Sequence, residues 1–402
     1  MYNTVLRARW LCTIHQLGRC QWQCPRFYTT PTSSTPSPFG VSEAEVQSAK
    51  VYCSNLLQKF DSPSHTLLAF IPPATQNAYL ALRAFNIETS RIADVASTAI
   101  IRSMRLQFWR DNINAAFALR PPKQPVSILL THALADLDAR TEGKGKMSKT
   151  WFMRILSERE KYMDGRPYPT MESLERYAEN TYSTLLYLTL QGIPVGSVAA
   201  DHIASHIGKA AGITAILRGL PLLAFPSPPN HHSNTSSLGG TLDPQRRTAQ
   251  GSVTLPLDVM VRAGVREEDV FRQGAEAAGL RDAVFEVATR ASDHLITARQ
   301  MLKNIYAGQD VGHAFEYEAE EEHQYRHQHQ DQYGRGAAAG GKSAQQREEV
   351  EGVFGVFMPA VATELWLNRL QKYDFDVFRE ELRRREWRLP WRGYWAFRRR
   401  MF

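Results

Sequence analysis

The chain has 402 residues, 43% hydrophobic and 22% charged, which excludes a disordered or fibrous protein and allows one large globular domain. Its formal net charge is +7, and both ends of the chain carry much of it. Three of its four cysteines, Cys12, Cys20 and Cys24, lie in the first 41 residues. The rest of the chain contains only Cys53, which excludes a disulfide framework or a cysteine metal site there.

The first 41 residues have the composition of a targeting segment. They contain several arginines and no acidic residue, and serine and threonine crowd their second half. This composition is typical of a mitochondrial presequence and predicts import into the matrix. No uninterrupted apolar stretch reaches the roughly 20 residues needed to cross a bilayer, so any attachment to the inner membrane is expected to be peripheral.

The folded domain is predicted to begin at Ser42, because Glu45 three residues later completes a capping box. Apolar residues then recur at helical spacing in a series of segments separated by proline or glycine. These predicted helices are 76–88, 94–119, 148–163, 170–190, 198–217 and 281–306. The single short strand candidate is Ser252 to Leu255. The pattern predicts an all-α helical bundle.

Two inserts interrupt this pattern. Residues 227–250 are rich in Pro, Ser, Asn and Gly and are predicted to be a disordered loop within the domain 42–308. Residues 309–350 contain acidic, His/Gln-rich and Gly/Ala-rich runs, typical of a low-complexity linker. Residues 351–402 then form a C-terminal helix and a basic, aromatic tail.

Two segments carry the most specific motifs. One is Arg83-Ala84-Phe85-Asn86-Ile87-Glu88-Thr89-Ser90, and the other runs from Gly208 through Ala210, Ile216 and Leu217 to Arg218. Together they resemble the two signature helices of the squalene/phytoene synthase family. The resemblance implies an isoprenoid-synthase-like bundle forming a single large domain.

The same comparison shows which motif residues are missing. The family has aspartates that hold Mg²⁺ against a diphosphate, in pairs at i and i+4 on one helix face. Asn86 and Ser90 stand at the first pair of positions, and Gly219 and Leu223 at the second. We therefore expect the chain to be a pseudoenzyme that has no catalytic residue and binds neither a metal ion nor a cofactor. The alternative is an active prenyl-diphosphate transferase with an altered metal site.

One branch of the family is more similar still, the mitochondrial complex I assembly factor 6 proteins. The strings that carry this likeness include Met104-Arg105-Leu106-Gln107-Phe108-Trp109 and the segment from Asp201 to Ala210. The resemblance implies a non-catalytic assembly factor whose partners are complex I subunits or assembly intermediates.

Five polar residues are candidates for lining the remnant cavity: Asp94, Arg105, Arg218, His202 and His206. The acid and the arginines either bind an anionic, lipid-like ligand or form ion pairs that replace the metal site. The two histidines, at i and i+4, either share a metal ion or hydrogen-bond within the bundle. Three aromatic residues are expected to pack in the core rather than to line a ligand box: Phe85, Phe108 and Trp109.

The C-terminal tail interleaves arginine with tryptophan. Arg388, Trp391, Arg392 and Trp395 are its candidates for membrane contact, because indole rings settle at headgroup depth and guanidinium groups meet phosphates. A plain solvated basic tail is the alternative. The tail contains no recognised nucleic-acid-binding module, so no nucleic-acid partner is expected.

Overall fold

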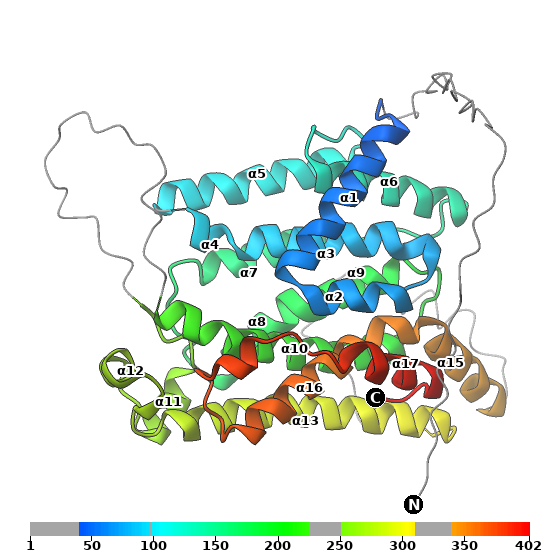
Figure 1. The fold of residues 1–402 in the computed structure, drawn as a ribbon. Coiled ribbons are helices and arrows are strands. Elements are labelled where there is room, and N and C mark those ends of the chain that lie inside the picture. The colour runs from blue at the N-terminus through cyan, green and yellow to red at the C-terminus, as the bar shows by residue number, and fades with distance from the viewer. Residues whose placement is uncertain (1–39, 97, 226–250, 310–338) are drawn as a thin grey trace, which may run out of the picture. The chain divides into compact units, whose positions relative to one another are not determined.

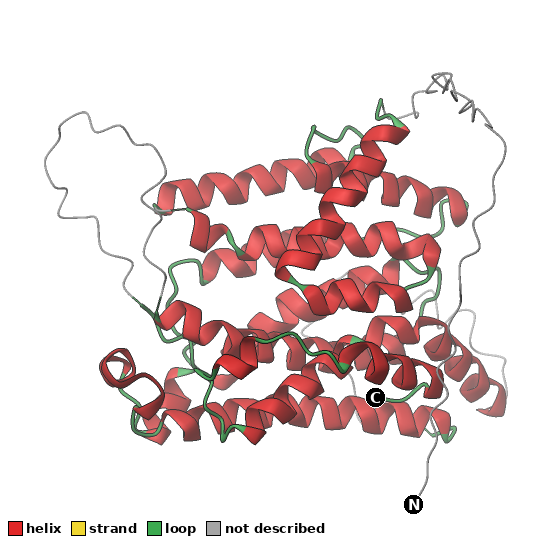
Figure 2. Ribbon diagram, viewed as in Figure 1, coloured by secondary structure: helices red, strands yellow, loops and turns green. Residues whose placement is uncertain are grey.

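The computed structural model describes residues 40–96, 98–225, 251–309 and 339–402, which all fall within one compact unit, Pro36–Phe402. The predicted presequence, the loop insert and most of the linker lie outside the described residues. The described part of the chain consists of helices and loops (Figure 2). The all-α prediction is confirmed. The strand prediction at Ser252 to Leu255 is wrong, since these residues form an irregular segment whose Val253 and Leu255 are buried.

The first half of the bundle contains the helices α1 (Glu43–Phe60), α2 (Ser62–Leu67), α3 (Gln76–Ser90), α4 (Ile92–Val95), α5 (Ala99–Phe117), α6 (Pro125–Arg140), α7 (Lys149–Lys161), α8 (Met171–Ala178) and α9 (Thr184–Gln191). The π-helical turn η3 (Glu179–Ser183) joins α8 to α9, and 3₁₀ turns η1 (Leu68–Phe70) and η2 (Pro73–Thr75) precede α3.

The second half contains α10 (Val198–Ala224), α11 (Leu257–Ala263), α12 (Glu267–Gln273), α13 (Leu280–Tyr306), α15 (Ala339–Val353), α16 (Pro359–Lys372) and α17 (Leu389–Arg399). Short 3₁₀ turns η4 (Gly274–Glu276), η5 (Phe354–Phe357) and η6 (Glu380–Arg383) connect them. Periodicity did not predict α2, α6, α11 or α12, and α15 begins within the expected linker.

The start of α1 follows from its sequence. The Ser42 side chain accepts a hydrogen bond from the Glu45 backbone N–H, and the Glu45 carboxylate accepts one from the Ser42 N–H at 2.8 Å. The predicted capping box is therefore confirmed. It satisfies backbone donors that the first helical turn leaves without partners.

Helix α10 is the centre of the bundle. It packs against α13, η3, α8, α9 and α16, while α5 and α6 lie on the other side of α3 and α7 (Figure 1). By length and hydropathy alone, α10 is long and apolar enough to cross a membrane. The helical segments Ala344–Phe357 and Pro359–Lys372, which are bent by 52° at their junction, reach the same length and hydropathy only if they are counted as one span. In this fold the apolar surface of α10 packs mainly against other helices, because 56% of its most apolar window is buried.

Two glycines permit this close packing. A Cβ atom on Gly208 would lie 2.3 Å from Cα of Ser183, and one on Gly212 would lie 2.6 Å from Cβ of Ala178. Because the two glycines are one helical turn apart, they form a flat strip on which η3 and α8 rest. Gly212 stands where the family has glutamine. Because glycine has no side chain, α8 can pack directly against the backbone of α10 at this position.

Candidate functional site

The first motif position, where the family has an aspartate, is occupied by Asn86 on α3. Its neighbour is Arg159 of α7, a buried guanidinium that donates to the Asn86 backbone oxygen at 2.8 Å and also to the Asn86 side-chain oxygen and the Thr89 hydroxyl. A cationic side chain of the protein is thus bound to the residue that would otherwise have to ligate a metal cation. Coulombic repulsion and occupied acceptors both oppose a divalent ion there.

Both motif arginines face the same group of residues. Charges on Asp61, Arg83 and Arg159 all act on the Tyr182 hydroxyl, and Arg218 is in turn within electrostatic reach of Asp61 and Tyr182. Burial is the main reason that the pKa of Tyr182 rises to about 12. We call Arg83, Arg159 and Arg218 the arginine centre. All three guanidinium groups therefore lie within electrostatic reach of Tyr182.

Arg83 is the least satisfied member of the arginine centre. It is buried, its guanidinium lies 5.3 Å from the Tyr79 ring centroid, and two of its nitrogens, Nε and Nη2, have no hydrogen-bond partner among the described residues. Nε of Arg159 is unpartnered as well. Buried donors of this kind are costly unless an acceptor or water meets them.

The second motif contributes Arg218 but no acid. Gly219 follows it on α10, and the guanidinium of Arg218 stacks 5.1 Å from the Trp366 ring centroid of α16. Arg218 is exposed, and desolvation by the protein around it lowers its pKa to about 10. The side chain remains protonated at neutral pH.

The nearest acidic side chains do not replace the missing ligands. Glu88 accepts a hydrogen bond from Tyr52 of α1 at 2.7 Å. Asp94 lies in α4, where burial raises its pKa against the opposing charges of Arg91 and Arg102. Among the described residues, no group of three or more His, Cys, Asp or Glu side chains could hold a metal ion. The residues present do not fit the family's Mg²⁺ cluster.

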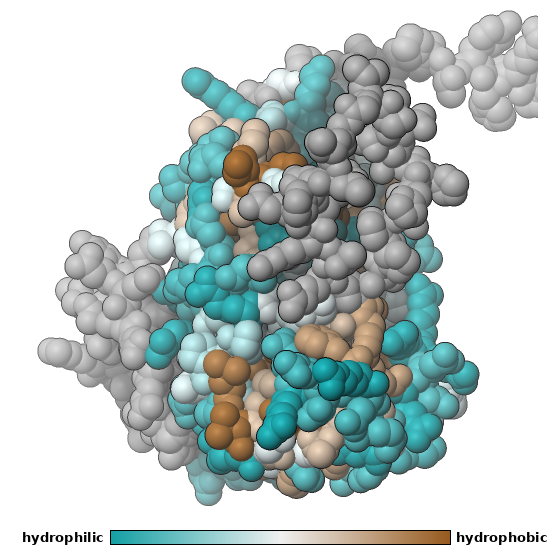
Figure 3. Space-filling model, turned by 90° about the vertical axis from the view of Figure 1, so that its left-hand side faces the viewer, coloured by the Kyte–Doolittle hydropathy of each residue, from teal (hydrophilic) through white to brown (hydrophobic). Residues whose placement is uncertain are grey.

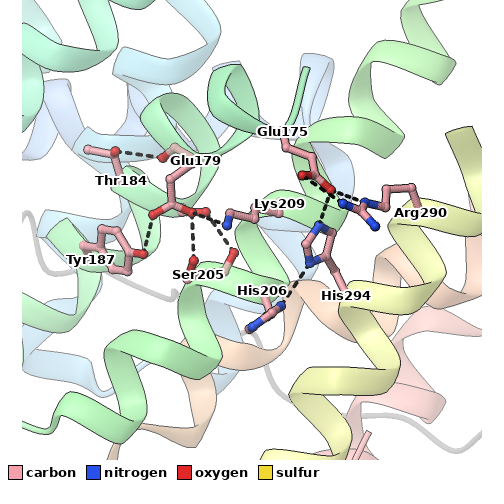
Figure 4. A network of polar contacts seen from close by, with 10 residues as sticks. Glu175, Glu179, Thr184, Tyr187, Ser205, His206, Lys209, Arg290 and His294 are labelled. Carbon is pink, nitrogen blue, oxygen red and sulfur yellow. Dashed lines mark hydrogen bonds and ion pairs between the residues drawn. The ribbon is translucent and has the colours of Figure 1, made fainter. Parts of the chain in front are cut away.

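A second polar network joins α8, α10 and α13 (Figure 4). Glu175 of α8 is paired with Arg290 of α13 and accepts from Nε2 of His294 at 2.9 Å. With that nitrogen as donor, Nδ1 of His294 is the acceptor for Nδ1–H of His206 at 2.9 Å. Burial raises the pKa of Glu175, but the hydrogen bonds from His294 and Arg290 outweigh it and bring the pKa down to about 2.

Glu179 in η3 anchors the adjoining part of this network. Its carboxylate accepts from the Tyr187 hydroxyl at 2.5 Å and from the Ser205 hydroxyl at 2.8 Å, and Nζ of Lys209 lies 4.0 Å away (Figure 4). Glu175 and Glu179 are four residues apart, and Glu175 contacts α13 whereas Glu179 contacts α10. Because cations and hydroxyl donors already occupy these carboxylates, they connect the helices rather than form a metal site.

The five predicted cavity residues lie on three helices. Asp94 lies in α4, whereas Arg218, His202 and His206 lie on α10. Arg105 is exposed on α5, which packs on α6 and α7. Of the two alternatives for the histidines, metal binding or hydrogen bonding within the bundle, His206 has a hydrogen bond, which it forms with His294.

The aromatic prediction is confirmed for two residues and wrong for the third. Phe85 is fully buried, with ring centroids 5.5 Å from Trp109 and 5.4 Å from Phe152 in edge-on contacts. Phe108 instead has 48% of its surface exposed. It lies on the opposite side of α5 from the core-facing residues, which periodicity did not distinguish because this helix is apolar on both sides.

The C-terminal segment forms a docked helix where the sequence indicated a tail. On one side of α17, Leu389, Gly393 and Ala396 are buried, and Phe397 packs on Phe70 at 5.2 Å between ring centroids. The four residues predicted for membrane contact are all exposed: Arg388, Trp391, Arg392 and Trp395. Arg388 also pairs with Glu386, and Arg392 lies 3.8 Å from Glu364.

Sequence reasoning missed Arg159, Tyr182 and Glu175. Arg159 had a detectable signal, since it continues the apolar stripe of Phe152 and Ile155 on α7 and a charged residue on such a stripe needs a buried partner. The Glu175 partners are more than a hundred residues away along the chain, at His294 and Arg290. No local pattern identifies such a pairing.

The fold and the two motif helices define a protein of the squalene-synthase type with altered metal positions. The profile of the squalene/phytoene synthase family matches residues 57–224 and 242–395, and the chain belongs to this family. A dehydrosqualene synthase structure superimposes with a TM-score of 0.57 at 15% identity, covering 88% of this chain and 96% of that one. Squalene synthase from Alicyclobacillus acidocaldarius gives 0.53 at 13% identity, covering 84% and 98%.

Two relatives are nearer in sequence. NADH dehydrogenase (ubiquinone) complex I, assembly factor 6, from Mus musculus is 32% identical over 375 residues, which cover 93% of this chain and 90% of that protein. The protein of the same name from Homo sapiens is 30% identical over 339 residues, covering 84% and 79%. The likeness to the structures shows the fold, whereas these relatives extend over nearly the whole sequence.

Proposed function

We propose that this chain is a non-catalytic assembly factor for mitochondrial respiratory complex I, acting on its subunits or assembly intermediates. Support comes from the relatives named as assembly factor 6 of complex I, which match over about 90% of the chain. The observation that carries the non-catalytic part is the contact between Arg159 and Asn86. A motif position bound to a guanidinium repels a metal ion and offers it one acceptor site fewer.

The chemistry of the family explains why this contact matters. Ionising a prenyl diphosphate requires metal ions that neutralise the leaving group as it departs. Here Asn86, Ser90, Gly219 and Leu223 provide no carboxylate at the motif positions. The arginine centre can hold an anion but is not arranged to bridge several phosphate oxygens with divalent charge. We infer binding without turnover.

The ligand we propose for the arginine centre is a lipid-like molecule with an anionic head. The unpartnered nitrogens of Arg83 and Arg159 support this, because a phosphate oxygen would satisfy them. The competing function, an active prenyl-diphosphate transferase, is tested by incubating purified protein with farnesyl or geranylgeranyl diphosphate and Mg²⁺. Sustained release of pyrophosphate would refute the pseudoenzyme proposal.

We place the protein on the matrix side of the inner membrane, as a peripheral protein. The docked helix α17 supports this location. Its outer side carries the exposed Trp391 and Trp395, and residues 383–402 contain eight arginines against the single acid Glu386, a net charge of +7. Such a surface suits an anionic headgroup layer.

The assembly role is tested by deleting the gene and separating native respiratory complexes on a gel. We expect mature complex I to fall severalfold and smaller intermediates to accumulate, with the other respiratory complexes unchanged. A rescue with the natural chain serves as the control and should restore complex I. Unchanged complex I in the deletion strain would contradict the proposal.

A further inference from the structure

Helix α5 (Ala99–Phe117) is apolar on two sides. Its inner side buries Leu106, Trp109 and Ile113 against the neighbouring helices α6 and α7. Among the described residues, no element covers the outer side of α5.

The outer side carries a regular row of large apolar side chains. Ile100 is 73% exposed, Met104 66% and Phe108 48%, at positions i, i+4 and i+8 along one edge of the helix. Ile101 and Val95 of α4 extend the row at its start, with 40% and 53% exposed. We call these five residues the α5 row. Single exposed apolar residues are ordinary, whereas a continuous row indicates an interaction surface.

Figure 3 looks at the end of the bundle where α4 and α5 begin. A small group of apolar side chains lies in the upper part of that face, with hydrophilic atoms on the side away from the residues drawn in grey (Figure 3). Spacing at i, i+4 and i+8 is the ridge that one helix presents to the groove of another. The α5 row therefore matches an α-helix better than an extended peptide, which would require alternating contacts or free strand edges.

The charges around the α5 row indicate the sign of the partner. Arg91, Arg102 and Arg105 lie in or beside it, against Asp94. Arg91 is stacked 3.8 Å from the centroid of Phe60, and Arg102 donates to the carbonyls of Ala96 and Met163. Arg105 is exposed and forms no ion pair with any described residue. It is the cation available to a partner, and it lies next to Met104.

We propose that the α5 row is a docking surface for an amphipathic helix of another protein, one whose apolar face is bordered by carboxylates. A carboxylate opposite Arg105 would fix the register while Ile100, Met104 and Phe108 fill the groove. A lipid surface fits less well, because the row has no tryptophan or tyrosine and only one uncommitted arginine. Those features belong to α17, which packs on α2 and α16 instead.

Site-specific photocrosslinking tests this proposal in intact mitochondria. The full-length chain carries p-benzoylphenylalanine at Met104, and a matched protein carries it at Ile296, an apolar residue of α13 that is 57% exposed. We expect a light-dependent adduct at Met104 with a different protein. Mass spectrometry should map it to a segment with apolar residues at i and i+4 and an acidic border. The yield at Ile296 should be about tenfold lower.

A charge variant supplies the second arm. Arg105→Glu should reduce the Met104 adduct on the order of tenfold, whereas Arg105→Lys should largely preserve it. Circular dichroism of both variants checks that the fold is intact. Adducts with lipid only, with a second copy, with residues 226–250 of this chain, or equally at both positions would overturn the proposal. Because the adduct is read without reference to complex I, its absence leaves the assembly role to be decided separately.

Discussion

The guanidinium of Arg159 is hydrogen-bonded to the side chain of Asn86, which stands where relatives with metal chemistry have an aspartate. In this chain the asparagine and the arginine form one buried contact. An aspartate at this position would form a buried ion pair with Arg159, and the positive charge of Arg159 would repel a metal ion. The altered motif is thus part of a packed structure and has not merely been left incomplete.

The first prediction concerns restoring the acid. Asn86→Asp should pair with Arg159 instead of creating a metal site, so millimolar Mg²⁺ should leave the melting temperature unchanged in both the variant and the natural protein. Thermal unfolding with and without Mg²⁺ measures this. A melting temperature that rises with Mg²⁺ in Asn86→Asp alone would show that the position can still bind metal.

Removing the arginine should be costly. Arg159→Met leaves the Asn86 and Thr89 oxygens buried without their donor, and we expect it to lower the free energy of unfolding by about 3 kcal/mol. Denaturant unfolding gives this value. Arg110→Met is a suitable control, since its ion pair with Glu160 is partly exposed and should contribute less than about 1 kcal/mol. Equal losses in the two variants would argue against a special role for Arg159.

The Glu175 carboxylate predicts a dependence on pH. Its pKa falls from 4.5 to about 2 in the folded chain, so its contribution is fully present above pH 4.5 and is lost as the pH falls toward 2. The contribution is about 3 kcal/mol. The difference in unfolding free energy between the natural chain and Glu175→Gln should therefore be large at pH 7 and shrink below pH 4.5. A difference that does not change with pH would contradict this origin.

Two glycines of α10, Gly208 in the packed strip and Gly219 outside it, predict opposite effects on stability when replaced by alanine. Gly208→Ala places a methyl group against the Ser183 backbone and should destabilise the chain by about 2–4 kcal/mol. Gly219→Ala meets nothing closer than Leu223 at 4.0 Å and should be neutral or stabilise by up to about 1 kcal/mol. Thermal unfolding of both variants checks this pair. Similar destabilisation of both variants, or of neither, would mean that the close packing at Gly208 does not decide the effect.

The outer side of α17 predicts binding to anionic membranes. The chain should sediment with vesicles of phosphatidylcholine containing cardiolipin and much less with phosphatidylcholine alone. Trp391, which is 67% exposed, should contribute on the order of tenfold in affinity when replaced by alanine. Phe285→Ala is the control, an exposed aromatic residue on α13. Unaltered sedimentation of Trp391→Ala would assign membrane contact to another surface.

By itself, the sequence determined the features that depend on neighbouring residues. The capping box at Ser42 fixed the start of α1, helical periodicity fixed the fold class, and the residues at 86, 90, 219 and 223 recorded the lost acids. These properties are local, since a helix is specified by spacing and by its caps, and a motif by which residues it contains.

Only the tertiary structure decided which residues meet. His206 and His294 are 88 positions apart and form one hydrogen bond, and Arg159 reaches Asn86 from a different helix. Arg105 and Phe108 turned outward although their neighbours Leu106 and Trp109 are core residues. Periodicity reveals that a helix has apolar sides but not which side its neighbours cover, because burial depends on how the helices pack together.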